Sequence, residues 1–474
     1  MTQLLRTAAA AEAFDLECEI LTPAQAADRV PILRTDDLQG AIWLPFDGTA
    51  NPTDVTQSLA KGARQLGVRI AERTRVIGID VRDGAVTGVL TDAGDVEADI
   101  VVNCAGQWAK AVGAMAGVTV PLHSAEHFYV VTEPIAGVDR MMPILRDPDG
   151  YTYMKEEVGG LVVGGFEPVA KPWVAPDELP YPFEFEILMD SALHRVPALN
   201  ETGIKKFYNG PESFTPDNQF VLGEAPEVRG MYVAAGFNSV GIASAGGAGR
   251  ALAEWIVAGE PQSDLVGVDI RRFASFNANT QWLRARVGEV LGLHYAVPWP
   301  NREFDTARPF RRSAVHGLVS ERGASFGSKM GWERPNFFAP AGQEPTIDYS
   351  WGFQNWKPWV DAEQRATREG VALFDETSFG KLLVQGPDAP DLLQWLCTAD
   401  VAVPVGRTVY TGVLNSRGTY EADVTVTRLA EDEYLWVTSA GSPVRDRDWI
   451  RRHAGDSRVE VADVSGAYTV LAVM

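Results

Sequence analysis

The sequence predicts a protein of mixed α/β and α+β class that is built from several domains. Near the amino end a helix pattern is followed by a series of strand patterns, and the middle of the chain alternates strand patterns with proline and glycine turns. Further on, a strand, a glycine-rich stretch and a helix follow one another at residues 231–258. Helices and strands in such an order fold into layered domains, and 474 residues suffice for roughly two to four of them.

The amino-terminal region is predicted to contain one helix and several short strands. Residues 54–67 place Val55, Leu59 and Leu66 near helical spacing, and Gly67 is a typical stop signal. Runs of β-branched and apolar residues then predict strands at 68–70, 75–80, 86–91 and 97–103.

The middle region is predicted to contain a pair of strands and a helix. The strands, 151–154 and 161–165, are joined by a polar loop at 155–160, and the helix spans 184–194. Residues 260–345 are rich in Pro, Arg and Trp and have weak periodicity, which is typical of a connecting or small packing domain.

A new globular unit is predicted to begin at about residue 364. The chain stops after an apolar run at 468–474. Such a run at a carboxyl end predicts a strand whose partners follow, so we expect the natural protein to continue beyond this chain.

Charge, hydropathy and cysteine spacing exclude several classes of function. The net charge is -21 and the isoelectric point is about 4.8, so nucleic acid is not expected as a partner. The sequence contains no run of about 18 or more apolar residues, so no membrane span is predicted. The first residues lack a secretory pattern, and the chain is therefore expected to be cytoplasmic. The cysteines and histidines show no metal-binding spacing.

The first candidate site is the apolar strand pattern at 99–106, which runs into the small residues Ala105 and Gly106. In FAD-binding enzymes such a strand ends where the chain passes under the dinucleotide, because only small residues let the backbone come so close. The alternative is an ordinary buried strand followed by a turn.

The second candidate site is the glycine-rich stretch 236–249, entered by a strand at 231–235 and left by a helix at 250–258. Backbone N–H groups at a helix start bind anionic or electron-rich oxygens, which suits the pyrimidine edge of a flavin. The alternative is close packing of helix on strand through glycine. No GxGxxG follows an amino-terminal strand, although dinucleotide-binding proteins normally open with one.

His127 is the histidine that stands out, because it follows Glu126 and precedes the aromatic and apolar strand 128–132. A histidine in this setting is either a structural residue or a proton carrier in catalysis.

Taken in order, these motifs resemble the sarcosine dehydrogenase and dimethylglycine dehydrogenase family. The resemblance runs over essentially the whole chain, and Thr49, where dimethylglycine dehydrogenases have His, favours the sarcosine branch. The segments that carry the resemblance in the flavin half are 47–52 (DGTANP), 101–109 (VVNCAGQWA), 127–133 (HFYVVTE), 195–199 (RVPAL), 210–217 (GPESFTPD), 223–226 (GEAP) and 269–273 (DIRRF).

The family joins an FAD-dependent amine oxidoreductase to a folate-binding unit like the glycine-cleavage T-protein. The resemblance implies a D-amino-acid-oxidase-like FAD domain with an antiparallel-sheet substrate domain at 1–260, a small connecting domain at 261–320, and part of a T-protein-like domain at 321–474. The family's opening βαβ unit and the later part of its T-protein-like unit have no counterpart here. We therefore expect an incomplete FAD domain and a chain truncated at both ends.

The resemblance also implies roles for residues of the flavin half. His127 and Tyr153 match a histidine and a tyrosine that lie near the reacting amine, and Val76 matches a residue whose backbone meets the adenine. The remaining residues expected to contact FAD are Ala105, Gly106, Gly236, Asn238, Ser239, Val240 and Gly241.

The carboxy-terminal part resembles the T-protein through residues 370–375 (GVALFD), 379–381 (FGK) and 410–418 (YTGVLNSRG). Asp423, in the segment GTYEADV, matches the aspartate of the tetrahydrofolate site, while Ala422 departs from the Asp-Asp pattern of T-proteins. Tyr410 is a second candidate for contact with folate.

The activity that the resemblance implies is FAD-dependent oxidative demethylation of sarcosine to glycine, with the one-carbon unit passed to tetrahydrofolate. Electrons would leave to an electron-transfer flavoprotein or to oxygen, and this activity is expected of the full-length parent. The alternatives are a dimethylglycine dehydrogenase or oxidase, and a non-catalytic relative such as the regulatory subunit of pyruvate dehydrogenase phosphatase.

Overall fold

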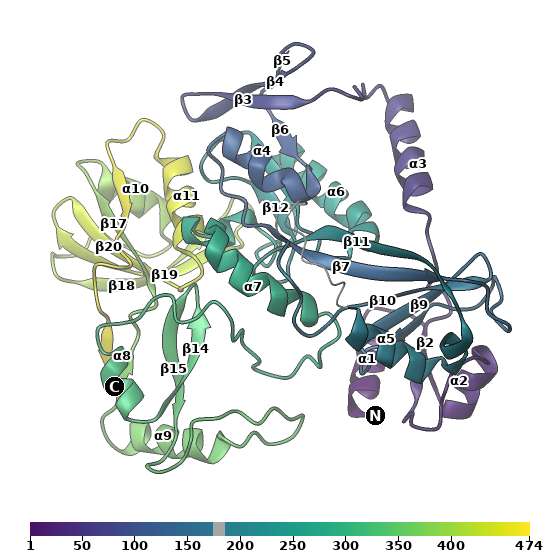
Figure 1. Ribbon diagram of the computed structural model, residues 1–474. Helices are drawn as coiled ribbons and strands as arrows, with labels where there is room; N and C mark the ends of the chain where they lie inside the picture. Colours follow the sequence, from purple (N-terminus) through teal and green to yellow (C-terminus); the bar gives the residue numbers. More distant parts are fainter. Residues whose placement is uncertain (174–184) are drawn as a thin grey trace.

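The computed structural model describes residues 1–173 and 185–474 (Figure 1). Its first elements form a small amino-terminal layer, and then a long helix, α3, leads away from it. These elements are α1 (Thr2–Ala13), β1 (Glu19–Leu21), α2 (Pro23–Arg29), β2 (Ala41–Trp43) and α3 (Pro52–Gln65). The predicted helix at 54–67 is therefore confirmed. Asn51 starts it, because its side chain accepts the backbone N–H groups of Thr53 and Asp54.

The predicted strand at 68–70 is wrong, because Val68 and Ile70 pair with no other strand in the described part of the chain and lie exposed. The next strands form an antiparallel sheet of β3 (Val76–Arg82), β4 (Ala85–Thr91) and β5 (Val96–Glu97). The single strand expected at 97–103 is divided, because β5 pairs with β4 while β6 (Val101–Asn103) joins another sheet.

That other sheet has the order β12-β13-β6, with β12 (Val221–Glu224) antiparallel and β6 parallel to β13 (Met231–Ala235). The 3-10 turn η1 (Gly106–Trp108) and α4 (Ala109–Met115) follow β6. Helix α6 (Gly241–Ala258) follows β13 and begins at Gly241, nine residues before the predicted start at Arg250. The glycines at 246, 247 and 249 lie inside this helix, and the positions that their Cβ atoms would take are open.

The largest sheet of the flavin half is antiparallel and has the order β11-β7-β10-β9-β8. Its strands are β7 (His123–Thr132), β8 (Leu145–Asp147), β9 (Thr152–Glu157), β10 (Gly160–Gly165) and β11 (Ile204–Phe214). Strand β9 runs further into the predicted polar loop than expected. Helix α5 (Glu186–Arg195) and the turn η3 (Pro197–Glu201) follow before β11, and Glu184 of the predicted helix lies outside the described residues.

One face of this sheet packs against α5. The buried side chains there include Phe128, Val130, Met154, Leu161, Val163 and Leu188. The side chains that alternate with them along each strand point to the opposite face, because successive residues of a strand face opposite sides. That opposite face carries the candidate active site.

The stretch 260–345, expected to have weak periodicity, contains regular elements. They are η4 (Ile270–Arg272), η5 (Ser275–Ala278), α7 (Thr280–Gly292), α8 (His316–Glu321), β14 (Ala324–Lys329) and β15 (Trp332–Phe338), followed by α9 (Lys357–Glu369). Helix α7 buries apolar and polar side chains together, since Arg286 lies among Leu283, Val287 and Leu291. This mixture explains why the apolar periodicity of α7 is weak.

The carboxy-terminal unit is built around an antiparallel sheet of order β18-β19-β20-β17-β21. Its elements are β16 (Leu373–Asp375), β17 (Gly380–Gln385), α10 (Ala389–Leu396), β18 (Thr408–Leu414), β19 (Tyr420–Ala430), β20 (Glu433–Thr438), α11 (Pro443–Ala454), β21 (Glu460–Asp463) and β22 (Leu471–Val473). The apolar run at 468–474 does contain a strand, but its partner precedes it, because β22 pairs with β16.

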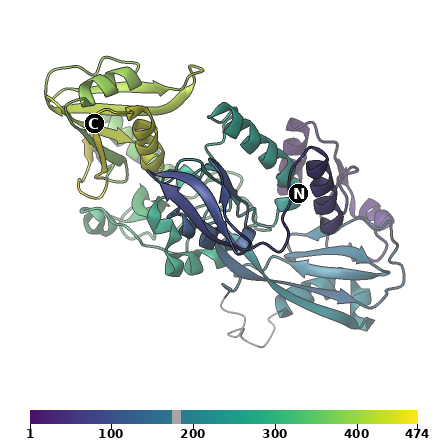
Figure 2. The ribbon, with the colours of Figure 1, turned by 90° about the horizontal axis from the view of Figure 1, so that it is seen from above.

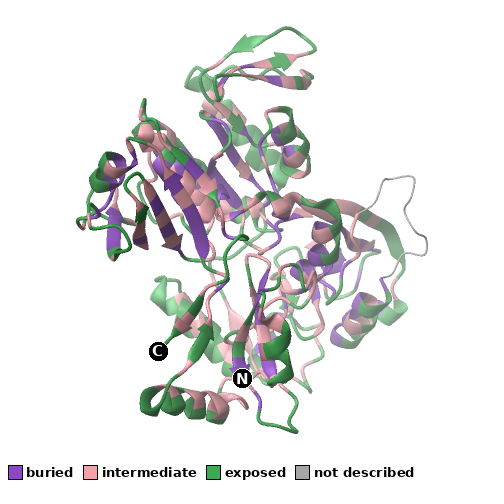
Figure 3. Ribbon diagram, turned by 90° about the vertical axis from the view of Figure 1, so that its left-hand side faces the viewer, coloured by how far each residue is buried: buried purple, intermediate pink, exposed green. Residues whose placement is uncertain are grey.

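Buried residues gather in the sheets, whereas α3 and α9 bury no residue (Figure 3). Seen from above, the carboxy-terminal unit and the large sheet of the flavin half lie at opposite ends of the molecule (Figure 2). The fold is thus of the predicted mixed α/β and α+β class, with antiparallel sheets in both halves. Within the described ranges, no helix is long and apolar enough to cross a membrane.

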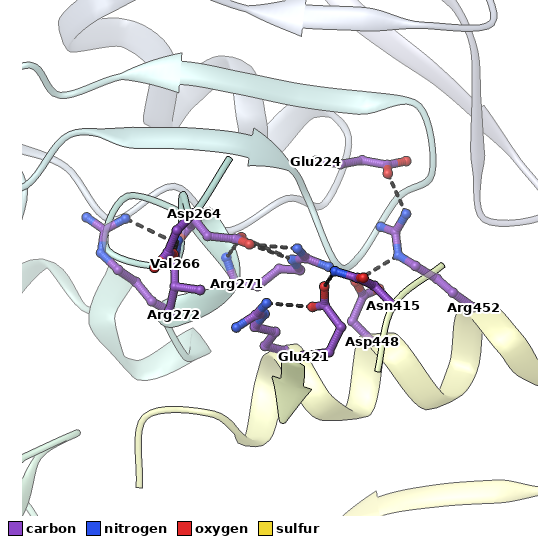
Figure 4. A network of polar contacts seen from close by, with 11 residues as sticks. Glu224, Asp264, Val266, Arg271, Arg272, Asn415, Glu421, Asp448 and Arg452 are labelled. Atoms are coloured by element: carbon purple, nitrogen blue, oxygen red, sulfur yellow. Dashed lines mark hydrogen bonds and ion pairs between the residues drawn. The ribbon is translucent and has the colours of Figure 1, made fainter. Parts of the chain in front are cut away.

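The flavin half and the carboxy-terminal unit meet through buried ion pairs between η4 and α11 (Figure 4). Arg271 lies between two aspartates: its Nη2 is 2.6 Å from Asp269 Oδ2 and its Nη1 is 3.2 Å from Asp448 Oδ2. Arg452 also contacts Asp448, at 2.7 Å from its Nε, and reaches Glu224 at the end of β12. Because these charges are buried, each depends on its partners for compensation.

Candidate active site

The candidate active site lies on the face of the large sheet that α5 does not cover. His127 comes from β7, Tyr153 from β9 and Glu212 from β11. Strand β10 lies between β7 and β9, and its Gly164 pairs with both Tyr129 and Tyr153. A Cβ at Gly164 would lie 2.3 Å from Tyr153 Oη. Glycine at this position therefore lets the phenol ring cross β10 and reach His127.

His127 contacts a partner with each of its ring nitrogens. Nδ1 lies 2.6 Å from Glu212 Oε2, and Nε2 lies 3.2 Å from Tyr153 Oη. Burial raises the pKa of Glu212, but the side chains of His127 and Ser239 outweigh that effect and the net pKa is lowered. Burial, assisted by Tyr295 and Glu212, raises the pKa of Tyr153 well above its usual value. Glu212 is therefore ionised and Tyr153 is a neutral phenol at physiological pH.

Phe166 is the centre of an aromatic wall around this group. Its ring centroid lies 4.9 Å from those of His127 and His294, and 5.0 Å from that of Tyr295. Arg146 holds the far side of the wall, because its Nε donates a 3.1 Å hydrogen bond to Tyr295 Oη. His294 and Tyr295 follow α7, so the region after the flavin half closes the site.

Burial shifts the pKa values of two polar groups near His127 toward their neutral forms. Burial raises the pKa of Glu167 to about 7 and lowers that of His294 to about 4. Glu167 Oε2, His294 Nε2 and His127 Nδ1 find no hydrogen-bond partner among the described residues. Because buried polar atoms in proteins are almost always paired, this concentration indicates a place for polar ligand atoms or ordered water.

The residues predicted to contact a flavin come together at one edge of the β12-β13-β6 sheet. Strands β6 and β13 are parallel, and Val101 pairs with Met231, so their carboxyl ends lie side by side. Ala105 and Gly106 follow one strand, and the turn 236–240 follows the other. Ligands of open α/β sheets bind at this end of the strands. Val76 is the exception, because it lies on the separate β3-β4-β5 sheet.

The turn 236–240 has an unusual backbone. Gly236, Asn238 and Ser239 have positive φ angles of 66°, 50° and 66°, which non-glycine residues rarely adopt. Asn238 is buried and secures the turn, because its Oδ1 accepts the backbone N–H of Thr215 at 2.9 Å and its Nδ2 donates to Thr215 Oγ1 at 3.1 Å. Ser239 of this turn also helps to lower the pKa of Glu212, so the turn at this edge influences the candidate active site.

The surface at this edge fits the flavin part of FAD. No atom lies within 4 Å of the position that a Cβ of Gly106 would take. Val240 and Ile242, at the start of α6, are 48% and 57% exposed. Small residues, open space, exposed apolar side chains and the N–H groups of a helix start are the features that an electron-rich ring edge requires.

The folate candidates form a second group, in the carboxy-terminal unit. Tyr410 Oη donates a 3.2 Å hydrogen bond to Asp423 Oδ2 across β18 and β19, and both residues are exposed. Tyr420 packs over Gly412 on the same pair of strands, since a Cβ there would lie 2.7 Å from the Tyr420 ring. The structure thus unites Tyr410 with Asp423, and His127 with Tyr153, as two separate sites.

Several residues of the site were not singled out from the sequence. Glu212 stands inside the segment GPESFTPD, yet only the pairing of β11 with β7 shows that it faces His127. Glu167 and His294 carry no local motif, because burial alone makes them notable. Gly164 is the residue that the sequence could have indicated, since a glycine inside a strand often marks a place where another group comes close to the backbone.

Comparison with known proteins divides the chain into three parts. Residues 1–255 match the family "FAD dependent oxidoreductase", residues 258–313 match "FAD dependent oxidoreductase central domain", and residues 315–474 match "GCVT N-terminal domain". The first match covers more than half of the chain.

Curated relatives match along nearly the whole chain. A 4-methylaminobutanoate oxidase (formaldehyde-forming) of Paenarthrobacter nicotinovorans is 39% identical over 100% of this chain and 58% of its own length. The mitochondrial sarcosine dehydrogenase of Homo sapiens is 38% identical over 88% of this chain and 50% of its own. The mitochondrial pyruvate dehydrogenase phosphatase regulatory subunit of Mus musculus is 36% identical over 96% and 54%. The chain thus spans about half the length of these relatives.

Proposed function

Because the chain belongs to the family of FAD-dependent oxidoreductases, we propose that the whole protein oxidises the N-methyl group of a small amino acid, with sarcosine as the substrate. The observation that carries this proposal is the His127–Tyr153 pair, 3.2 Å apart beside an aromatic wall and unpaired buried polar atoms. Similarity to a sarcosine dehydrogenase supports the choice of substrate.

The chemistry requires a neutral amine. The nitrogen lone pair must be free to form the C=N bond of the iminium product as a hydride leaves the methyl carbon, so the ammonium proton has to be removed first. His127 is the group suited to take that proton, because an unprotonated imidazole nitrogen is a common general base in enzymes. The raised pKa of Tyr153 keeps its hydroxyl protonated, so this residue orients the amine or relays a proton.

The charges around the site favour binding of the substrate amine in its cationic form, before His127 removes the proton. Glu212 is the ionised acid beside His127, while Glu167, with its pKa of about 7, is partly protonated at neutral pH. The ring centroids of Phe166 and Tyr153 lie 6.0 Å apart beside His127, and aromatic rings attract methylammonium groups. FAD, when bound at Gly106 and the start of α6, would accept the hydride.

We further propose that the carboxy-terminal unit captures the one-carbon unit on tetrahydrofolate. The similarity of residues 315–474 to the GCVT domain supports this step. The exposed rings of Tyr410 and Tyr420, with the Asp423 carboxylate between strands, provide a surface for a flat, hydrogen-bonding ring. Holding both sites in one protein raises the effective concentration of the reactive iminium. An electron-transfer flavoprotein or oxygen is the proposed acceptor.

The test is sarcosine-dependent reduction of an artificial dye by the full-length protein loaded with FAD. His127→Gln should lower kcat by roughly 100-fold to 10,000-fold, the usual contribution of a positioned general base. His194→Gln is the matched control, because His194 is a surface histidine paired with Asp37, and its activity should equal that of the wild type. Wild-type turnover in His127→Gln would refute the role of His127.

A second candidate substrate is 4-methylaminobutanoate, favoured by the oxidase that is 39% identical over the whole of this chain. Values of kcat/KM for sarcosine, dimethylglycine and 4-methylaminobutanoate on one preparation rank the candidates. A flavin-loaded wild type that oxidises none of them would instead support a non-catalytic protein, like the phosphatase regulatory subunit to which the chain is similar.

A further inference from the structure

Among the described residues, Glu212 is the ionised carboxylate that contacts His127, and the sequence around it does not predict that contact. It lies on β11, where it pairs with Ala125 of β7, so its side chain projects from the same face as His127. The 2.6 Å between Oε2 and Nδ1 is the distance of an ion pair, although Nδ1 makes no hydrogen bond in the proper direction to the carboxylate or to any other described residue. Because an ionised carboxylate has acceptor atoms only, a proton on the nitrogen that faces it is favoured over a lone pair.

The other groups around His127 do not compete for Nδ1. Tyr153 faces Nε2, and Phe166 presents a ring edge to the imidazole. Of the two other buried groups nearby, His294 is neutral, with a pKa of about 4, and Glu167, with a pKa of about 7, is only partly ionised at neutral pH. Glu212 is therefore the group that decides which ring nitrogen of His127 is protonated.

We propose that Glu212 is a positioning residue that holds His127 with Nδ1 protonated and with Nε2 free to accept the proton of the substrate amine. The proposal rests on the function proposed above. It extends to Ser239, which lowers the pKa of the Glu212 carboxyl and has a backbone φ of 66°. Asn238 and Thr215 lock that turn, which explains why a strained backbone is retained at the edge of the flavin surface.

The direct test is the tautomer of His127, read from the nitrogen chemical shifts of the full chain labelled with ¹⁵N-histidine. The signal is assigned by its disappearance in His127→Gln. In the wild type we expect a protonated Nδ1 and an unprotonated Nε2. Glu212→Gln has the same size but an amide that donates as well as accepts, so the signal should move toward the other tautomer. An unchanged signal overturns the proposal.

Two further variants keep the test decisive. Glu157→Gln removes another carboxylate of the same sheet, one that pairs with Lys155, and should leave the His127 signal unchanged. A shift as large as that of Glu212→Gln would overturn the proposal. If Glu212→Gln does not fold, Ser239→Ala decides, because it keeps the carboxylate and removes only the hydroxyl that helps to keep it ionised. A partial shift in Ser239→Ala supports the proposal, and no shift overturns it.

Kinetics on the FAD-loaded full-length protein separate this inference from the proposed function. Glu212→Gln should lower kcat by roughly 10-fold to 100-fold with little change in KM, as expected for loss of a group that orients a catalytic residue. A wild type that oxidises no amine, with a tautomer that still depends on Glu212, refutes only the proposed function. An active wild type whose tautomer ignores Glu212 refutes only the positioning role.

Discussion

Glu167 should make the protein less stable as the pH rises through neutrality, and Glu167→Gln should remove that dependence. The carboxyl group is buried, its Oε2 has no hydrogen-bond partner among the described residues, and burial raises its pKa to about 7 from 4.5. A carboxyl whose pKa is raised on folding binds its proton more tightly in the folded state. Stability therefore falls between about pH 4.5 and about pH 7, the two pKa values, and stays low above that range.

The size of the effect follows from the two pKa values. At about 1.4 kcal/mol for each tenfold change in proton affinity, ionised Glu167 destabilises the fold by up to about 3 kcal/mol at pH 8. At pH 5.5 the folded state has kept its proton while the unfolded state has mostly lost it, so the cost is about 1 kcal/mol. The amide of Glu167→Gln does not titrate, so the variant should exceed the wild type by about these amounts.

Urea unfolding of both proteins at pH 5.5 and pH 8, followed by tryptophan fluorescence, measures the difference. Glu157→Gln is the control, because its carboxylate is 44% exposed and pairs with Lys155 on the surface. Its effect should be no more than about 1 kcal/mol at either pH. The reasoning fails if Glu167→Gln is no more stable than the wild type at pH 8, or if its advantage is the same at both pH values.

Two further predictions concern a close side-chain contact and a buried ion pair. Gly164→Ala places a methyl group where the Tyr153 phenol lies, so it should displace that ring, cost about 1–3 kcal/mol of stability and lower amine oxidation; a variant with wild-type unfolding and turnover would contradict the role of Gly164. Arg271→Met leaves two buried aspartates short of a partner at the domain interface and should cost about 3–5 kcal/mol, measured by urea unfolding. Arg250→Met, which removes an exposed ion pair, should cost far less stability than Arg271→Met, because water screens exposed charges, and equal losses in the two variants would contradict the argument.

Local patterns succeeded where a segment is stabilised by contacts close to it in the chain. The helix α3 follows from an Asn cap, a proline in the first turn and apolar residues at helical spacing. The strands β3 and β4 follow from runs of β-branched and apolar residues, although their pairing was not predicted. These elements were predicted nearly to their ends.

Local patterns failed where contacts between residues far apart in the chain decide the secondary structure of a segment. The glycines of α6 have low helix propensity, so the stretch was predicted as a turn, yet it is helical from Gly241 because Leu252 and Trp255 anchor the helix on β12 and β13. Val68 and Ile70 have strand propensity but meet no neighbouring strand, and they remain exposed. The strand β22 pairs with β16, which lies about 100 residues earlier in the chain, and no local pattern indicates a pairing over that separation.

The sequence by itself determined the mixed fold class, the family resemblance and the two groups of residues that the resemblance marks, His127 with Tyr153 and Tyr410 with Asp423. It did so because alternation, turn residues and ordered motifs are properties of short segments. The tertiary structure alone decided that Glu212 meets His127, that Gly164 opens the path for Tyr153, and that Glu167 holds its proton near neutral pH. Proton affinities and side-chain contacts depend on burial and on strands far apart in the chain, and both exist only once the chain has folded.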